Sequence, residues 1–127
     1  MNVELLKRIQ EVIREEPRRL DMGSWGNSSN RVPCGTVACI AGWAIALESG
    51  ERGPQLENSL VDMIFVGGVE VEAARILDLT PKQSGQLFFD AAWPEQFDIN
   101  AHSPQTPEYA DVACRRIDHF IQTGGEQ

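Results

Sequence analysis

The sequence lacks any long hydrophobic run. In 127 residues no apolar stretch approaches the ~20 residues that a membrane-spanning helix needs. The first 17 residues carry charged side chains throughout and contain no apolar core of the kind found in secretory signals. We therefore expect a cytoplasmic protein with no membrane partner.

Cysteine is also scarce, and its spacing argues against a metal centre. Cys34, Cys39 and Cys114 occur with only two histidines, and no Cys-x-x-Cys pair is present. A structural zinc site draws on four such ligands, usually at short characteristic spacings. The chain has no glycine-rich phosphate-binding motif and no dinucleotide fingerprint either. The sequence therefore predicts reduced thiols, no metal and no cofactor.

Basic residues are outnumbered. Eleven Lys and Arg stand against 19 Asp and Glu, which gives a net charge of −8, and residues 51–100 alone carry −6. A large surface for nucleic-acid phosphates requires the opposite balance. We expect no nucleic-acid partner, and the acidity favours solubility or a basic partner.

Apolar periodicity predicts an all-α fold in a single domain, residues 1–127. We expect a bundle of about five helices around a buried central one, with two long loops, 17–33 and 94–106, anchored by apolar side chains. Residues 49–59 are expected to form a loop as well, and the apolar run 60–66 fits either a helical turn or a strand. The helices are expected at about residues 5–16, 36–48, 69–78, 81–93 and 107–123.

The central helix is the most distinctive element. From Val37 to Leu47 every residue is apolar or glycine, which is typical of a helix buried on all sides. Thr36 is its expected N-cap. A ridge of small residues four positions apart should let a neighbouring helix approach closely; it consists of Ala38, Gly42 and Ala46.

The next two helices should form a hairpin. Thr80, Pro81 and Gln83 make a capping-box pattern at the start of the second of them. The buried side chains are expected to be Val71, Ala74, Ile76 and Leu77 in the first, and Leu87, Phe88, Ala91 and Ala92 in the second.

This hairpin has some likeness to a DNA-binding helix-turn-helix. The second helix of such a motif exposes side chains that contact bases and phosphates. Here it offers Lys82, Gln83 and Gln86 within an acidic segment, and three aromatic residues follow. We favour an ordinary helical hairpin and keep a DNA-associated regulator as a weaker alternative.

Cys34 is the one candidate nucleophile. A thiol beside a helix N-terminus feels the positive end of the helix dipole, which favours the reactive thiolate. A hydrolase of this kind would also need an imidazole, and the sequence cannot place His102 or His119 beside Cys34. The alternative is that Cys34 and Cys39 are small buried apolar residues around a turn at Gly35.

A ligand groove is a further hypothesis. Trp25 and Trp93 fall at loop edges, where aromatic side chains often line a binding groove. The expected groove residues are Trp25, Cys34, Thr36, Trp93 and His102.

One motif carries a resemblance. The segment CGTVACIAG, followed by LDLTPKQ and a Leu-Phe pair, resembles a family of small bacterial and phage-borne proteins that have no assigned activity. The resemblance implies a bacterial origin and assigns no catalytic role. The matching residues are Cys34, Gly35, Thr36, Cys39, Ala41, Gly42, Leu77, Leu79, Gln83, Leu87 and Phe88.

Together these observations favour a non-catalytic binding or protein-interaction module with a protein or small-ligand partner. A small enzyme that uses Cys34 is the alternative hypothesis. The sequence leaves the partner, the ligand and the oligomeric state open.

Overall fold

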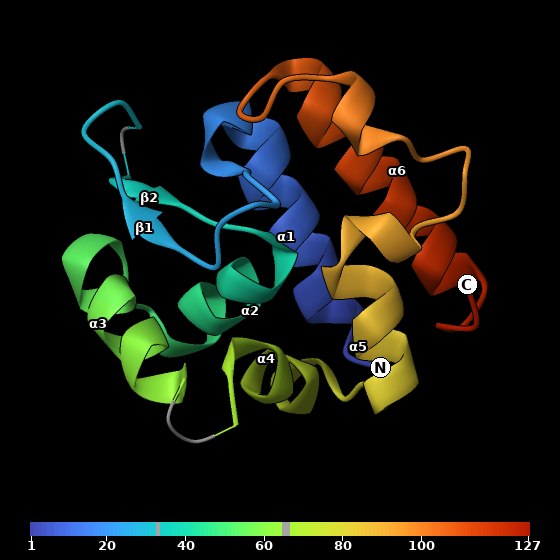
Figure 1. Cartoon of the computed structure of the whole chain (residues 1–127), viewed down its shortest axis with the longest axis horizontal. Coiled ribbons are helices and arrows are strands. Elements are labelled where there is room, and N and C mark those ends of the chain that lie inside the picture. Colours follow the sequence, from blue (N-terminus) through green and yellow to red (C-terminus); the bar gives the residue numbers. More distant parts are fainter. Residues whose placement is uncertain (33, 65–66) are drawn as a thin grey trace.

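The chain folds into helices with two long connections between them, residues 16–39, which include one small hairpin, and residues 89–106. The computed structural model describes residues 1–32, 34–64 and 67–127, and Figure 1 shows the arrangement. The all-α prediction is confirmed, with six α-helices in the described part of the chain. The α-helices are α1 (Val3–Glu15), α2 (Ile40–Ser49), α3 (Gly53–Met63), α4 (Val69–Leu77), α5 (Pro81–Phe88) and α6 (Pro107–Gln122); the 3-10 helices are η1 (Pro17–Arg19), η3 (Asp90–Ala92) and η4 (Ile99–Ala101); the strands are β1 (Asn27–Ser28) and β2 (Thr36–Val37).

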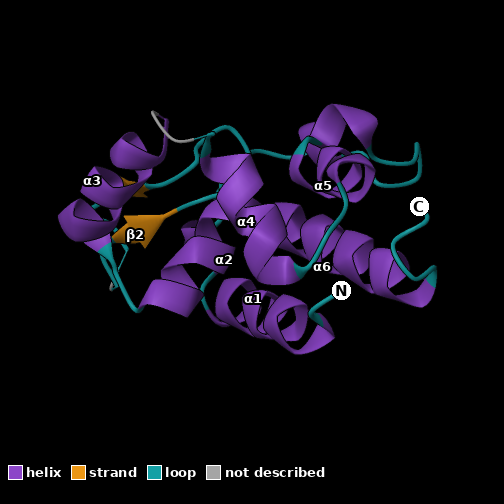
Figure 2. Ribbon diagram, turned by 90° about the horizontal axis from the view of Figure 1, so that it is seen from below, coloured by secondary structure: helices purple, strands orange, loops and turns teal. Residues whose placement is uncertain are grey.

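Helix α2 forms the centre of the molecule. It contacts α1 and α4 extensively and also touches α5, while α1 in turn packs against α6. Figures 1 and 2 show this helix enclosed by its neighbours. Every residue from Ile40 to Ala46 is buried, as the absence of polar side chains predicts. Gly50 ends the helix in the left-handed conformation that glycine adopts without strain.

The predicted start of this helix at Thr36 is wrong. Thr36 and Val37 form β2, which pairs with β1 in antiparallel register, and Cys39 is the N-cap of α2. Ala38 also exchanges backbone hydrogen bonds with a second segment, since its N–H donates to the Arg19 carbonyl at 2.9 Å and its carbonyl accepts from Asp21 N–H at 3.2 Å. Residues 36–38 are all buried, and a short buried run of this kind fits a strand as well as a helix.

Helix α3 lies where a loop was expected at residues 49–59. Gly53 and Pro54 suggest a turn, but they occupy the first turn of the helix, where proline is well tolerated. Leu56 and Leu60, four residues apart, bury one face. Of the apolar run 60–66, which fitted either a helix or a strand, residues 60–63 are helical and belong to α3. Residues 65–66 lie outside the described part of the chain.

The hairpin of α4 and α5 is present with two corrections. The capping box of Thr80 and Gln83 is confirmed. In α4, however, Val71 is exposed, whereas Ala73 takes an inward position. The apolar face of this short helix is therefore displaced from the one that the sequence suggests.

The second correction concerns the end of α5. The helix stops at Phe88, and Phe89 adopts an extended conformation before η3, so that Ala91 and Ala92 are exposed. The indole N–H of Trp93 donates to the Leu87 carbonyl at 2.9 Å and satisfies one of the carbonyls left free at the helix end. This contact folds the chain back instead of extending the helix.

No helix in the described ranges combines the length and apolar character of a membrane span.

Candidate functional site

The predicted groove residues occupy several places in the fold. Thr36 is buried, and its hydroxyl accepts a hydrogen bond from the Gly53 N–H at 2.7 Å, which joins β2 to the start of α3. Cys34 is half-buried, and its thiol donates to the Thr36 carbonyl at 3.6 Å. These two residues are therefore brought together, in a role that supports the hairpin.

The other expected groove residues make their contacts elsewhere in the fold. Trp93 is buried against the end of α5, where its indole N–H donates to the Leu87 carbonyl. His102 is exposed and lines a shallow depression at the start of α6 with Glu108 and Arg115. Trp25 packs edge-on against Phe89, with ring centroids 6.0 Å apart and an interplanar angle of 88°.

Cys34 also lacks the helix dipole that was expected to activate it. The thiol at the N-terminus of α2 belongs to Cys39, whose Sγ accepts a hydrogen bond from the Gly42 N–H at 3.4 Å. Burial raises the pKa of the Cys39 thiol to about 11, because desolvation penalises the thiolate more than this hydrogen bond favours it. The thiol at the positive end of the dipole is thus the neutral, inaccessible one.

Metal-binding geometry is likewise not found in the part of the chain that the structure describes. All three thiols are free, and no group of three or more His, Cys, Asp or Glu side chains is arranged to hold an ion. Cys114 is buried on the inner side of α6, and burial raises its pKa to about 11 as well.

The polar side chains of α5 are occupied by the fold. Gln83 Oε1 accepts from the Thr80 N–H at 2.9 Å within the capping box. Gln86 Nε2 donates to the carbonyl of Glu126 at 3.4 Å, near the end of the chain. Lys82, the third candidate DNA-contacting residue, is exposed and has no side-chain hydrogen bond to the described residues.

The surface does contain a concentration of exposed apolar side chains. Five large hydrophobic residues are exposed among the described residues, and each lines one of three neighbouring depressions. We call these five residues the apolar face: Trp25, Val61, Ile64, Val71 and Phe89.

Trp25 is the centre of this face. It is 37% exposed and lines two of the depressions. One, of about 190 Å³, lies between residues 22–25 and the end of α5 at Phe89. The other, of about 300 Å³, lies between Trp25 and α3, where Val61 and Ile64 form the wall.

The backbone around Trp25 is fixed by two glycines. Gly42 of α2 lies beneath the Trp25 carbonyl, and Gly26 faces the side chains of Leu56 and Leu60 on α3. A methyl group at either glycine would collide with these neighbours. The chain at residues 25–26 therefore lies close against α2 on one side and against leucine side chains of α3 on the other.

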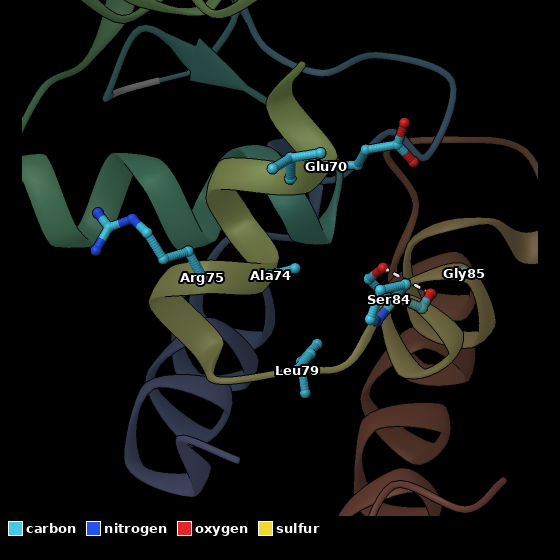
Figure 3. Close-up of a pocket in the computed structure, with 8 residues that line it drawn as sticks. Glu70, Ala74, Arg75, Leu79, Ser84 and Gly85 are labelled. Atoms are coloured by element: carbon cyan, nitrogen blue, oxygen red, sulfur yellow. Dashed lines mark hydrogen bonds between the residues drawn. The ribbon is translucent and has the colours of Figure 1, made fainter. Parts of the chain in front are cut away.

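The third depression is the groove between α4 and α5, of about 390 Å³. Figure 3 shows Ala74 and Leu79 between the two helices, with Ser84 and Gly85 on the opposite wall. Val71 belongs to this groove, and Val69, two residues earlier on another side of α4, lines the depression beside α3. Helix α4 therefore contributes to both depressions, and Figure 1 shows α3, α4 and α5 following one another along the lower side of the molecule.

Sequence reasoning found Trp25 but missed most of this face. Val61 and Ile64 lie in the run 60–66, which was too short for its period to distinguish a helix from a strand, and both are exposed at the end of α3. The spacing of Leu56 and Leu60 gave a signal for Val61, because the residue after Leu60 lies on another side of a helix. It gave none for Ile64, which shares the face of the two leucines by spacing and is exposed because it is the C-cap at the helix end.

No family model matches the chain, and no curated protein or solved structure matches it.

Proposed function

We propose that the chain is a non-catalytic protein-interaction module that binds its partner through the apolar face. One observation carries this proposal: all the large hydrophobic residues that the described chain exposes line three depressions, which are formed by α3, α4, the α5 region and residues 22–26. Monomeric domains rarely leave such residues gathered together unless the surface is used.

The composition of the face also favours a protein partner. Tryptophan and phenylalanine at the centre of a patch are typical anchors of interfaces, because they bury a large area with few rotatable bonds. The Trp25 backbone additionally packs closely against Gly42 of α2, which restricts its movement toward that helix. A rigid anchor loses little conformational freedom on binding, which favours affinity.

Photo-crosslinking in cells of the source organism tests the proposal. A p-benzoylphenylalanine side chain would replace Phe89 or Ile64 on the apolar face, and Arg115 on α6 as the matched exposed control. We expect the same protein adduct from both face positions and none from Arg115, and Trp25→Ala should reduce the yield several-fold.

The same experiment distinguishes the interaction module from the alternative function, a small enzyme that uses Cys34. Cys34→Ala should leave the adduct unchanged, because Cys34 lies outside the apolar face. Absence of an adduct at both face positions, or equal adducts from all three positions, would contradict the proposed function.

A further inference from the structure

The groove between α4 and α5 has the form of a site for side chains from another helix. Its walls are mainly aliphatic, from Val71, Ala74 and Leu79, and it is open along its length to solvent. The hydroxyl of Ser84 is turned back to the Pro81 carbonyl at 2.9 Å, so this wall offers no free donor to the groove. Small-molecule sites normally add several convergent polar groups that fix the ligand, and this groove is poor in them.

Gly85 leaves room on the α5 wall. A side-chain carbon built at Gly85 meets no atom within 4 Å, although the residue lies inside a regular helix with an ordinary backbone. Glycine in a helix interior is destabilising relative to alanine, so the stability of α5 does not explain the glycine at residue 85 or the open space beside it. This space admits the aliphatic anchor of a docked helix, in the mode where residues at i, i+3 or i+4, and i+7 enter a groove.

The charge at the rim of the α4–α5 groove favours a partner helix with basic side chains. Figure 3 shows the Glu70 side chain extending from α4 toward the α5 side of the groove, whereas Arg75 points away from α5. Arg75 is already paired with Glu72, and the described residues provide Glu70 with no ion pair. Residues 53–90, which include α3, α4 and α5, carry six acidic and two basic side chains. A second copy of this chain would bring the same negative charge to the interface and is disfavoured.

We propose that the α4–α5 groove binds a basic amphipathic helix of the partner protein, an inference that rests on the proposed function. The apolar anchors of that helix lie against Val71, Leu79 and the open space at Gly85. A lysine or arginine that flanks these anchors pairs with Glu70 at the rim.

A displayed library of 14-residue helical peptides is the probe. Its members carry Leu, Ile, Met or Phe at positions i, i+4 and i+7, and Lys, Glu, Gln or Ala at the flanking positions. Selection on the intact protein should enrich lysine at the flanks. For the enriched peptide, Gly85→Leu should raise Kd at least tenfold by filling the groove, and Glu70→Lys should raise it about as much.

Two controls separate groove binding from damage to the fold. Gly85→Ala adds a methyl group in open space, so the variant should fold at least as stably and should weaken binding far less than Gly85→Leu. A peptide with glutamate in place of the flanking lysine should bind Glu70→Lys better than the unaltered protein, a rescue that a misfolded variant cannot show.

The outcomes distinguish this inference from the proposed function. Enrichment of acidic or uncharged flanks, binding that survives Gly85→Leu, or no enriched peptide overturns the basic-helix inference, and so does a dimer in light scattering that Gly85→Leu dissolves. If crosslinking at Phe89 still yields its adduct in the Gly85→Leu variant, the proposed function stands without the groove.

Discussion

The backbone carbonyl of Trp25 lies directly against the α-carbon of Gly42, so close that a side chain at residue 42 would overlap it. An exposed aromatic residue is thereby positioned by a buried helix. The small residue predicted at this place serves a close approach, but the partner is the loop segment at Trp25 rather than a neighbouring helix.

This relationship gives a matched pair of glycine substitutions. Gly42→Ala should lower the free energy of unfolding by ~1–3 kcal/mol, because a carbonyl of the main chain must move to admit the methyl group. Gly85→Ala makes the same chemical change in another helix, where nothing lies within 4 Å, and should raise stability by ~0.5–1 kcal/mol. Urea unfolding followed by circular dichroism measures both. Equal effects of the two substitutions would contradict the close approach at Gly42.

The sequence predicts the helices well where a periodic pattern coincides with a cap. Thr80 caps α5 as expected, α6 begins at Pro107 as expected with Thr106 as its cap, and the buried α2 follows from its composition alone. The pattern fails at residues 36–37, because a buried Thr-Val pair fits the start of an apolar helix as well as the strand β2 that it forms. No local signal announces that residues 19–21 will pair with Ala38.

The candidate site was harder to predict for a related reason. An apolar side chain in a sequence is read as a core residue, and the periodicity of α4 assigned Val71 to the interior. Only the tertiary arrangement shows that Val71 and Ile64 remain outside, at 56% and 64% exposure. Apolar residues that remain on the surface can be recognised only once the packing of the core in three dimensions is known.

Thiol reactivity should follow the burial of the three cysteines. With iodoacetamide and the native protein, Cys34 should be labelled first, since Cys39 and Cys114 are inside the core with raised pKa values. The two buried thiols should react only at the rate of unfolding. Peptide mass spectrometry resolves the three sites, and labelling of Cys39 as fast as Cys34 would contradict the buried cap of α2.

The same thiols predict a loss of stability in alkaline solution. Burial raises the pKa of the Cys39 and Cys114 thiols to about 11, above the ordinary value of 9.0. The folded state therefore holds these protons more tightly than the unfolded state, and this contribution is complete below pH 9 and lost as pH rises to 11. Unfolding free energies at pH 8, 9, 10 and 11 should fall more steeply for the unaltered protein than for the Cys39→Ala/Cys114→Ala double variant. Cys34→Ala is the control, and a double variant with an unchanged pH slope would refute this account.

Arg116 of α6 should be replaceable by an apolar side chain of similar length. It is fully buried, its guanidinium lies 5.9 Å and 5.5 Å from the ring centroids of Phe97 and Phe120, and it forms no ion pair with any described carboxylate. Burial lowers its pKa to about 10. The guanidinium donates to the Gln86 carbonyl at 3.2 Å and contacts His119 Nδ1 at 3.4 Å, while Nε has no hydrogen-bond partner among the described residues.

Arg116→Met keeps the aliphatic stem and removes this buried charge, so the free energy of unfolding should change by no more than about 1 kcal/mol or should rise. Arg116→Ala also removes the stem and should cost ~2–4 kcal/mol through the cavity it leaves. Chemical denaturation at pH 7 compares the two variants. Equal losses for Met and Ala would mean that the guanidinium, through its hydrogen bond to α5 and its contacts with the aromatic rings, stabilises the fold more than its desolvation opposes it.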